Sequence, residues 1–178
     1  MNRQEIIDWL LSGDPSLRFQ VKRDLLMETE CVIQSERNRI TYEGWGAKLL
    51  SFQDEDGKWS RQLYNGKWIS TTYTLLLLAE LGILPDARTR KACQQLFLGG
   101  LYNDEEIRFS SKQKLRDNGV SGLVLGILSY FEYSDPRIHN LAEYLRRSQN
   151  QDGSWFFDNR EGAEKYCFEN TLDRKSVV

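Results

Sequence analysis

The sequence has few of the residues that mark disulfide-rich, metal-binding or membrane proteins. Its 178 residues include three cysteines and a single histidine, His139. An odd number of widely spaced cysteines favours buried thiols in a reducing cytoplasm over a disulfide framework. The longest apolar run, Leu75 to Ala79, is far shorter than the ~20 apolar residues that a membrane-spanning helix needs. We therefore expect a cytoplasmic protein without a transmembrane segment.

The charge of the chain also lacks a strong bias. Its 24 basic and 26 acidic residues give a net charge of −2, with no basic arm or acidic tail, which argues against a nucleic-acid partner. With 40% apolar residues, a chain of this length can bury roughly two-thirds of its unfolded surface in one domain. The first eleven residues carry acids within their apolar stretch, so they predict an amphipathic helix and not a signal peptide.

The clearest pattern is a repeat of about 48 residues. Residues 53–59 and 149–155 share the pattern Gln-x-x-Asp-Gly-x-Trp, and they begin 96 positions apart. A middle copy at residues 101–107 keeps only Asp104. Fixed periods of this size are typical of helical repeat proteins. The repeated residues, which we expect to be structural, are Gln53, Asp56, Gly57, Trp59, Gln149, Asp152, Gly153 and Trp155.

Helix signals recur in step with this motif. Asp14-Pro15, Pro85-Asp86 and Asp135-Pro136 each predict a helix start, because Asp accepts the free amide protons of a first turn. Residues 86–97 and 136–147 are amphipathic, whereas 70–82 and 119–131 are apolar nearly all round. A strand at Leu75 to Leu78 is disfavoured by the length of the segment, its leucine content and Gly82 at its end. The repeating unit therefore pairs one half-exposed helix with one buried helix.

The motif has a physical role that does not depend on any family. Asp-Gly forms a turn because Asp bonds its local backbone and Gly tolerates positive φ. We expect the side-chain amides of Gln53 and Gln149 to cap the preceding outer helix. Trp59 and Trp155 are expected to tie each turn to the neighbouring hairpin.

The repeating unit consists of an outer helix, a turn with this motif and an apolar inner helix that begins with Ser or Thr. This unit resembles the repeat of the terpenoid cyclase and protein prenyltransferase superfamily. In that superfamily the turn pattern is called the QW motif, and the helices form two concentric rings around a cavity. The resemblance covers residues 41–160. It implies an all-α, α/α-toroid-like array in one domain, residues 1–178. That domain comprises an N-terminal helical pair at 1–40 and hairpins at 41–84, 85–134 and 135–178.

A ring built from so few hairpins would stay open. The third inner helix, expected at residues 166–178, is also unusually polar. The chain is therefore interpreted either as a remnant of a longer toroid or as a short protein whose open apolar edge pairs with a second copy. Since exposed apolar surface costs about 25 cal/mol per Å², we expect a homo-oligomer.

The catalytic motifs of the superfamily are missing. Asp54-Glu55-Asp56 lies inside the turn and does not supply the Asp-x-Asp-Asp acid of the cyclases. Asp117 stands just before an inner helix, so it is the best single candidate acid, although a lone Asp at such a position is more often an N-cap than a proton donor. The prenyltransferase zinc set of Asp, Cys and His is absent, and we expect neither metal nor cofactor. Candidate cations for a diphosphate are Lys67, Arg108 and Arg116.

Residues at the start of the inner helices are candidates for lining a cavity. Cys167 occupies the position 96 residues after Thr71. The candidate ligand-binding residues are Trp68, Thr71, Thr72, Tyr73 and Cys167. Three hypotheses stay open: a binding protein for an apolar isoprenoid, lipid or protein partner, a cyclase- or prenyltransferase-type enzyme acting on a polyprenyl substrate, and a HEAT-like interaction scaffold.

Overall fold

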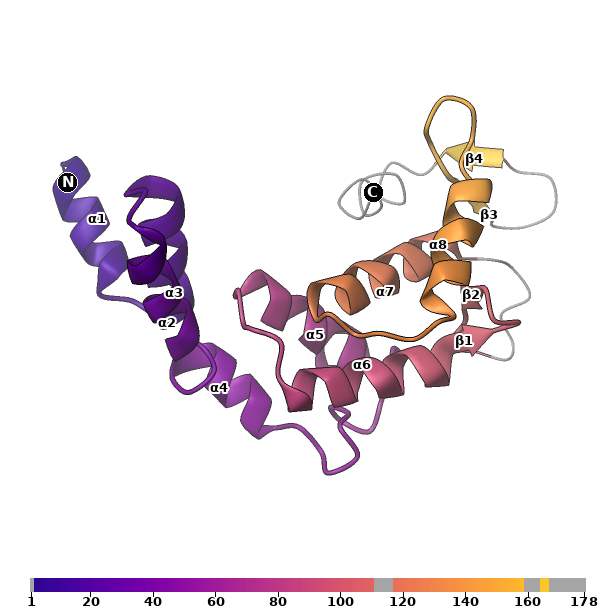
Figure 1. Ribbon diagram of the computed structural model, residues 1–178, viewed down its shortest axis with the longest axis horizontal. Coiled ribbons are helices and arrows are strands. Elements are labelled where there is room, and N and C mark those ends of the chain that lie inside the picture. The colour runs from indigo at the N-terminus through magenta and orange to yellow at the C-terminus, as the bar shows by residue number, and fades with distance from the viewer. Residues whose placement is uncertain (1, 111–116, 159–163, 167–178) are drawn as a thin grey trace.

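The chain is mostly helical, as expected (Figure 1). The computed structural model describes residues 2–110, 117–158 and 164–166. A π-helical turn, Val21–Leu25, continues α2, and a 3-10 turn, Lys67–Ile69, precedes α5. The α-helices are α1 (Arg3–Leu11), α2 (Pro15–Gln20), α3 (Glu30–Arg39), α4 (Gly44–Ser51), α5 (Thr71–Glu80), α6 (Ala87–Gly100), α7 (Asn118–Tyr130) and α8 (Ile138–Arg147).

The helix starts follow the predicted caps. Asp14 accepts a hydrogen bond from the Ser16 amide at 2.9 Å, and Asp86 accepts from two amides of α6 in a capping box. Asp135 accepts instead from the Arg137 amide, and α8 begins only at Ile138. The third signal therefore forms a turn just ahead of its helix.

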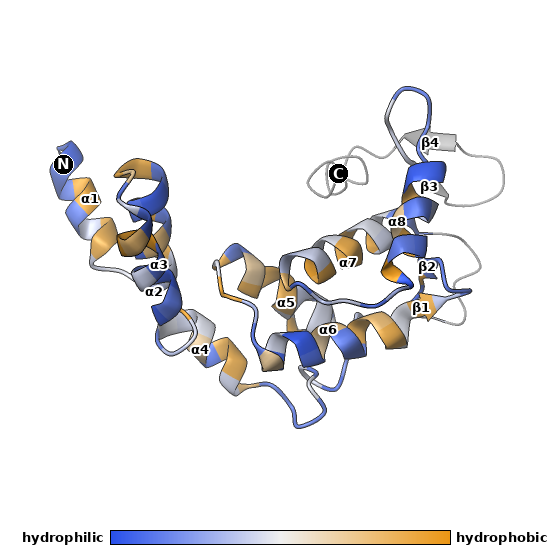
Figure 2. Ribbon diagram, in the orientation of Figure 1, coloured by the Kyte–Doolittle hydropathy of each residue, from blue (hydrophilic) through white to orange (hydrophobic). Residues whose placement is uncertain are grey.

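Helices α5 and α7 are the two buried helices, and they pack against each other and against α6. Helix α8 packs on α7, while α4 lies beside α5. In Figure 2, α5 and α7 carry few strongly hydrophilic residues. The fully buried core side chains include Leu75, Leu78, Leu96, Phe97, Leu128 and Phe131. The predicted helix over Leu75 to Leu78 is thus confirmed.

Two short antiparallel strand pairs replace parts of the expected helical pattern. The degenerate middle copy forms β1 (Leu101–Tyr102) and β2 (Glu106–Ile107), joined through Asn103 and Asp104 with φ of 50° and 57°. After α8 come β3 (Phe156–Asp158) and β4 (Glu164–Tyr166). Tyr166, the expected start of a third inner helix, therefore lies in a strand, and residues 167–178 fall outside the described residues. This segment lacks the leucine-rich character of α5 and α7.

The first forty residues form three helices where a pair was expected. Asp14-Pro15 starts a new helix after α1, and the chain then turns into α3. In Figure 1, α1, α2 and α3 lie at one end of the molecule and α8 lies at the other. This N-terminal group contacts the repeats at the start of α4, where the Trp45 amide donates to Asp14 at 2.7 Å, and near the C-terminal ends of α5 and α7, where Arg37 donates to Gly82 and Tyr130.

Candidate functional site

The two motif turns have the same internal geometry. Trp59 and Trp155 are both buried, and each indole Nε1 donates to the carbonyl ten residues earlier, Leu49 at 2.8 Å and Leu145 at 2.9 Å. Each glycine has positive φ, 93° at Gly57 and 81° at Gly153. Each tryptophan therefore ties its turn to the outer helix of its own hairpin. This hydrogen bond does not reach the neighbouring hairpin, contrary to the prediction.

The glutamines of the motif close the turns and do not cap the helix end. Gln53 Nε2 donates to the Gly57 carbonyl at 2.8 Å, and Gln149 Nε2 donates to the Gly153 carbonyl at 3.0 Å. Gln53 also donates to the Arg88 carbonyl in α6 at 3.0 Å. The predicted capping role is therefore wrong. Each side-chain amide donates to a carbonyl of its own turn, and the amide of Gln53 also donates to the next outer helix, α6.

A groove of about 700 Å³ lies between the inner helices α5 and α7. Ligand sites in proteins commonly have volumes of this size and mostly apolar walls. Among the described residues that line it, Glu80 alone is charged. The lining residues are Trp68, Tyr73, Leu76, Ala79, Glu80, Gly122, Leu123, Gly126, Ile127, Ser129 and Tyr130.

The groove contains two of the five candidate ligand residues. Trp68 and Tyr73 line it. Thr71 and Thr72 do not, because both are fully buried and their hydroxyls donate to the Gln62 and Leu63 carbonyls, each at 2.7 Å. These threonines anchor the loop before α5, and Cys167 lies outside the described residues.

An aromatic cluster fixes the end of the groove at the start of α5. The ring of Tyr73 lies 5.2 Å from Trp68 and 5.7 Å from Tyr64, and Tyr64 stacks on Phe109 at 5.2 Å. Burial, then the hydrogen bond with Tyr73 and the charge of Asp117, raise the pKa of Tyr64. This phenol therefore stays neutral at physiological pH.

Asp117, the candidate acid, acts as the N-cap of α7. Its side chain accepts from the Val120 amide at 3.0 Å. Among the candidate cations, Lys67 is exposed, Arg108 pairs with Glu106 at 2.6 Å, and Arg116 lies outside the described residues. His139 is exposed in the first turn of α8, as expected. Within the part of the chain that the structure describes, no group of three potential ligands could hold a metal.

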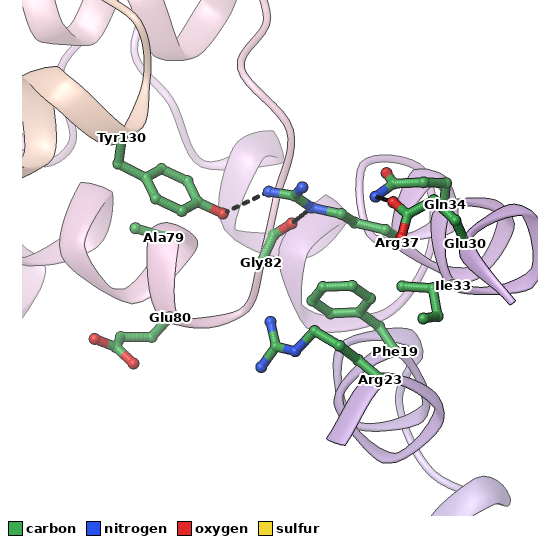
Figure 3. A pocket seen from close by; sticks show the side chains of 10 residues that line it. All are labelled: Phe19, Arg23, Glu30, Ile33, Gln34, Arg37, Ala79, Glu80, Gly82 and Tyr130. Carbon is green, nitrogen blue, oxygen red and sulfur yellow. Dashed lines mark hydrogen bonds between the residues drawn. The ribbon is translucent and has the colours of Figure 1, made fainter. Parts of the chain in front are cut away.

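A second, more polar pocket of about 210 Å³ lies where the N-terminal helices meet the repeats (Figure 3). Phe19, Arg23, Glu30, Ile33, Gln34 and Arg37 form one wall, and Ala79, Glu80, Gly82 and Tyr130 form the other. Sequence reasoning missed this site, since its residues come from four α-helices, the π-helical turn after α2 and a loop, and follow no common spacing.

No family model, curated protein or solved structure matches the chain. The resemblance to the toroid superfamily therefore stays an expectation from the sequence pattern. None of the helices in the described ranges has the length and apolar character to cross a membrane.

Proposed function

We propose that the chain is a binding protein built from α/α-toroid-like hairpins, and that its α5–α7 groove accepts an elongated apolar molecule such as an isoprenoid or a lipid chain. The groove is the observation that supports this proposal. It follows the two inner helices, the elements that face the cavity in the superfamily that the motif resembles. The cellular site of this binding is proposed to be the cytoplasm.

The energetics favour an apolar occupant. Leu76 and Leu123 line opposite walls and are only half-buried. A ligand that removes their remaining apolar surface from water gains about 25 cal/mol per Å². Tyr73 and Trp68, whose rings lie 5.2 Å apart, present aromatic surface at one end of the groove that can cover the end of a bound chain.

Native mass spectrometry of the purified protein tests the proposal directly, because a bound lipid or isoprenoid would be detected as added mass. Binding of a fluorescent apolar probe should fall at least tenfold when Leu76→Asp or Leu123→Asp places a charge in the groove. Leu98→Asp is the matched control, because Leu98 is 47% exposed on α6 and lines neither cavity described above. Equal binding by all three variants would contradict the proposal.

An enzymatic role acting on a polyprenyl substrate is the alternative function. Asp117 supports it only by its position before an inner helix, and its carboxylate already accepts the Val120 amide. Incubation with farnesyl diphosphate or squalene, with and without Asp117→Asn, distinguishes the two functions. Turnover that the substitution abolishes would favour the enzyme.

Self-association is a second candidate, favoured by the surface between α4 and α5. A hollow of about 300 Å³ there is lined by Trp45, Lys48, Leu49, Phe52, Leu77 and Leu81. Trp45 and Phe52 are 59% and 61% exposed beside it. The rings of Trp45 and Phe52 are part of this hollow, so the face is one apolar patch of the kind that can pair with the same patch on a second copy around a two-fold axis. Light scattering after size exclusion should give a dimer mass that Trp45→Ser lowers to a monomer.

A further inference from the structure

Two guanidinium groups flank one aromatic ring in the polar pocket. The Cζ atoms of Arg23 and Arg37 lie 4.9 Å and 5.5 Å from the centre of the Phe19 ring. Figure 3 shows both guanidinium groups directed toward the space between Phe19 and the end of α5. The two cations place positive charge on one side of this space, whose lining also contains Glu30 and Glu80.

The positive charge of Arg37 is not balanced by a carboxylate partner among the described residues. Its Nε donates to the Gly82 carbonyl at 2.7 Å and its Nη2 donates to the Tyr130 hydroxyl at 3.1 Å, and both acceptors are neutral. No carboxylate pairs with it in the part of the chain that the structure describes. Arg23 differs, because Asp24 binds it at 2.6 Å and 2.8 Å. The half-buried Arg37 therefore keeps donor capacity for an anion.

The carboxylates of the pocket are engaged or directed elsewhere. Glu30 accepts from Gln34 at 2.7 Å. The Glu80 carboxylate is turned away from both guanidinium groups in Figure 3. Among the described residues neither carboxylate forms an ion pair with Arg37, so the remaining donors of this arginine stay available to a ligand.

This pocket adjoins the apolar groove. Ala79, Glu80 and Tyr130 line both cavities. A ligand lying along α5 and α7 therefore reaches the two arginines at the C-terminal ends of these helices. The combined site has an aromatic end at Trp68 and Tyr73 and a cationic end at Arg37.

We propose that the pocket holds the headgroup of a long-chain carboxylate whose apolar chain lies in the α5–α7 groove. This inference rests on the proposed function, and it adds the polarity of the ligand and its direction in the groove. A carboxylate can accept two parallel hydrogen bonds from one guanidinium, and such charge-assisted bonds are roughly twice as strong as neutral ones. The pocket of about 210 Å³ leaves room for one such group.

The test compares cis-parinaric acid, a fluorescent long-chain carboxylate, with its methyl ester on the full chain. The acid should bind at least tenfold more tightly than the ester, and the difference should shrink as salt is added. Acetate should not displace the acid at comparable concentration, since it lacks the chain. Displacement by acetate alone would overturn the proposal in favour of a simple anion site.

Variants assign the effect to the arginines. Arg37→Gln and Arg23→Gln should lower affinity for the acid toward that of the ester, while Arg37→Lys should keep part of the preference. Arg39→Gln is the matched control, because it removes the same charge from α3 outside both cavities. Binding of the ester reports whether each variant is folded, and Arg23→Gln serves as the second variant if Arg37→Gln unfolds.

The outcomes separate this inference from the function on which it rests. Equal affinity for acid and ester, or unchanged affinity for the acid in both glutamine variants, would overturn the headgroup site and leave groove binding intact. Absence of binding by either probe would overturn the proposed function itself. Stronger competition by a long-chain amine than by the acid would show that the pocket selects the opposite charge.

Discussion

Arg37 and Tyr130 join the N-terminal helices to the repeats, with Nη2 of the arginine donating to the phenol oxygen at 3.1 Å. The same hydroxyl donates to the Ile83 carbonyl at 3.0 Å. Arg37 also holds the Gly82 carbonyl, so the turn after α5 is fixed from two sides. A single aromatic hydroxyl thus links α3, α7 and the turn between α5 and α6.

Removing that hydroxyl should loosen the junction. Tyr130→Phe loses two hydrogen bonds, each worth about 0.5–1.5 kcal/mol net, so we expect the free energy of unfolding to fall by about 1–3 kcal/mol. Urea denaturation followed by circular dichroism measures the change. Tyr102→Phe is the control, since its hydroxyl forms no hydrogen bond with any of the described residues and Tyr102 is 43% exposed. Equal stabilities of the two variants would contradict this role.

The two motif glutamines should differ in their contribution to stability. Gln53 donates both to its own turn and to Arg88 in α6, whereas Gln149 donates only to its own turn. We therefore expect Gln53→Ala to lower the free energy of unfolding by about 1 kcal/mol more than Gln149→Ala, the value of one net hydrogen bond. Chemical denaturation of the two variants measures this difference, and a larger effect at Gln149 would count against it.

The thiols of Cys31 and Cys93 should differ in their reactivity toward alkylating reagents. Cys93 is fully buried, and burial raises the pKa of its thiol to about 12, whereas Cys31 is exposed. Because the thiolate is the reactive form, iodoacetamide at pH 8 should label Cys31 and leave Cys93 unmodified until the protein unfolds. Peptide mapping by mass spectrometry identifies the labelled site. Rapid labelling of Cys93 under native conditions would show that α6 is not packed as described.

The features that sequence predicted correctly have local causes. Asp14 and Asp86 cap helices because an Asp side chain reaches only the amides of the next few residues. The apolar helix that contains Leu75 follows from composition over ten residues, and the motif turns follow from Asp-Gly pairs. Trp68, in the turn before this helix, and Tyr73, in its first turn, line the groove, while their role in binding a ligand stays a prediction.

The features that sequence missed depend on tertiary contacts. The strands β1 and β2 are two residues each, too short for a period-two pattern to appear. Thr71 and Thr72 face a loop and not the groove, because the carbonyls of Gln62 and Leu63 return to the helix start. The pocket around Phe19 and Arg37 arises only when α2 and α3 dock on α5 and α7. No residue spacing in the sequence predicts this contact between the helices.

A buried carboxylate should dominate the stability of the N-terminal helices. Glu36 is 4% exposed and binds Arg18 at 2.7 Å and Lys22 at 2.5 Å. Glu36→Gln leaves two partly buried cations without their shared anion. We therefore expect the free energy of unfolding to fall by about 2–4 kcal/mol. This loss is slightly smaller than is usual for a broken buried ion pair, because both cations keep some exposure to solvent. Glu43→Gln, whose pair with Arg39 is exposed, should cost at most about 0.5 kcal/mol. Chemical denaturation measures both losses, and a similar loss for the two variants would contradict the importance of burial.

The stabilisation by Glu36 should also depend on pH. Burial raises its pKa, but the hydrogen bonds from Lys22 and Arg18 outweigh burial, so the folded pKa lies below the ordinary 4.5. The unfolded chain therefore binds the proton more readily. The contribution is complete above about pH 4.5 and is lost as the pH falls through the folded pKa. The stability difference between the unmodified chain and Glu36→Gln should then shrink below pH 4.5 in urea titrations. A difference that grew as the pH fell would show that Glu36 is held in its protonated form.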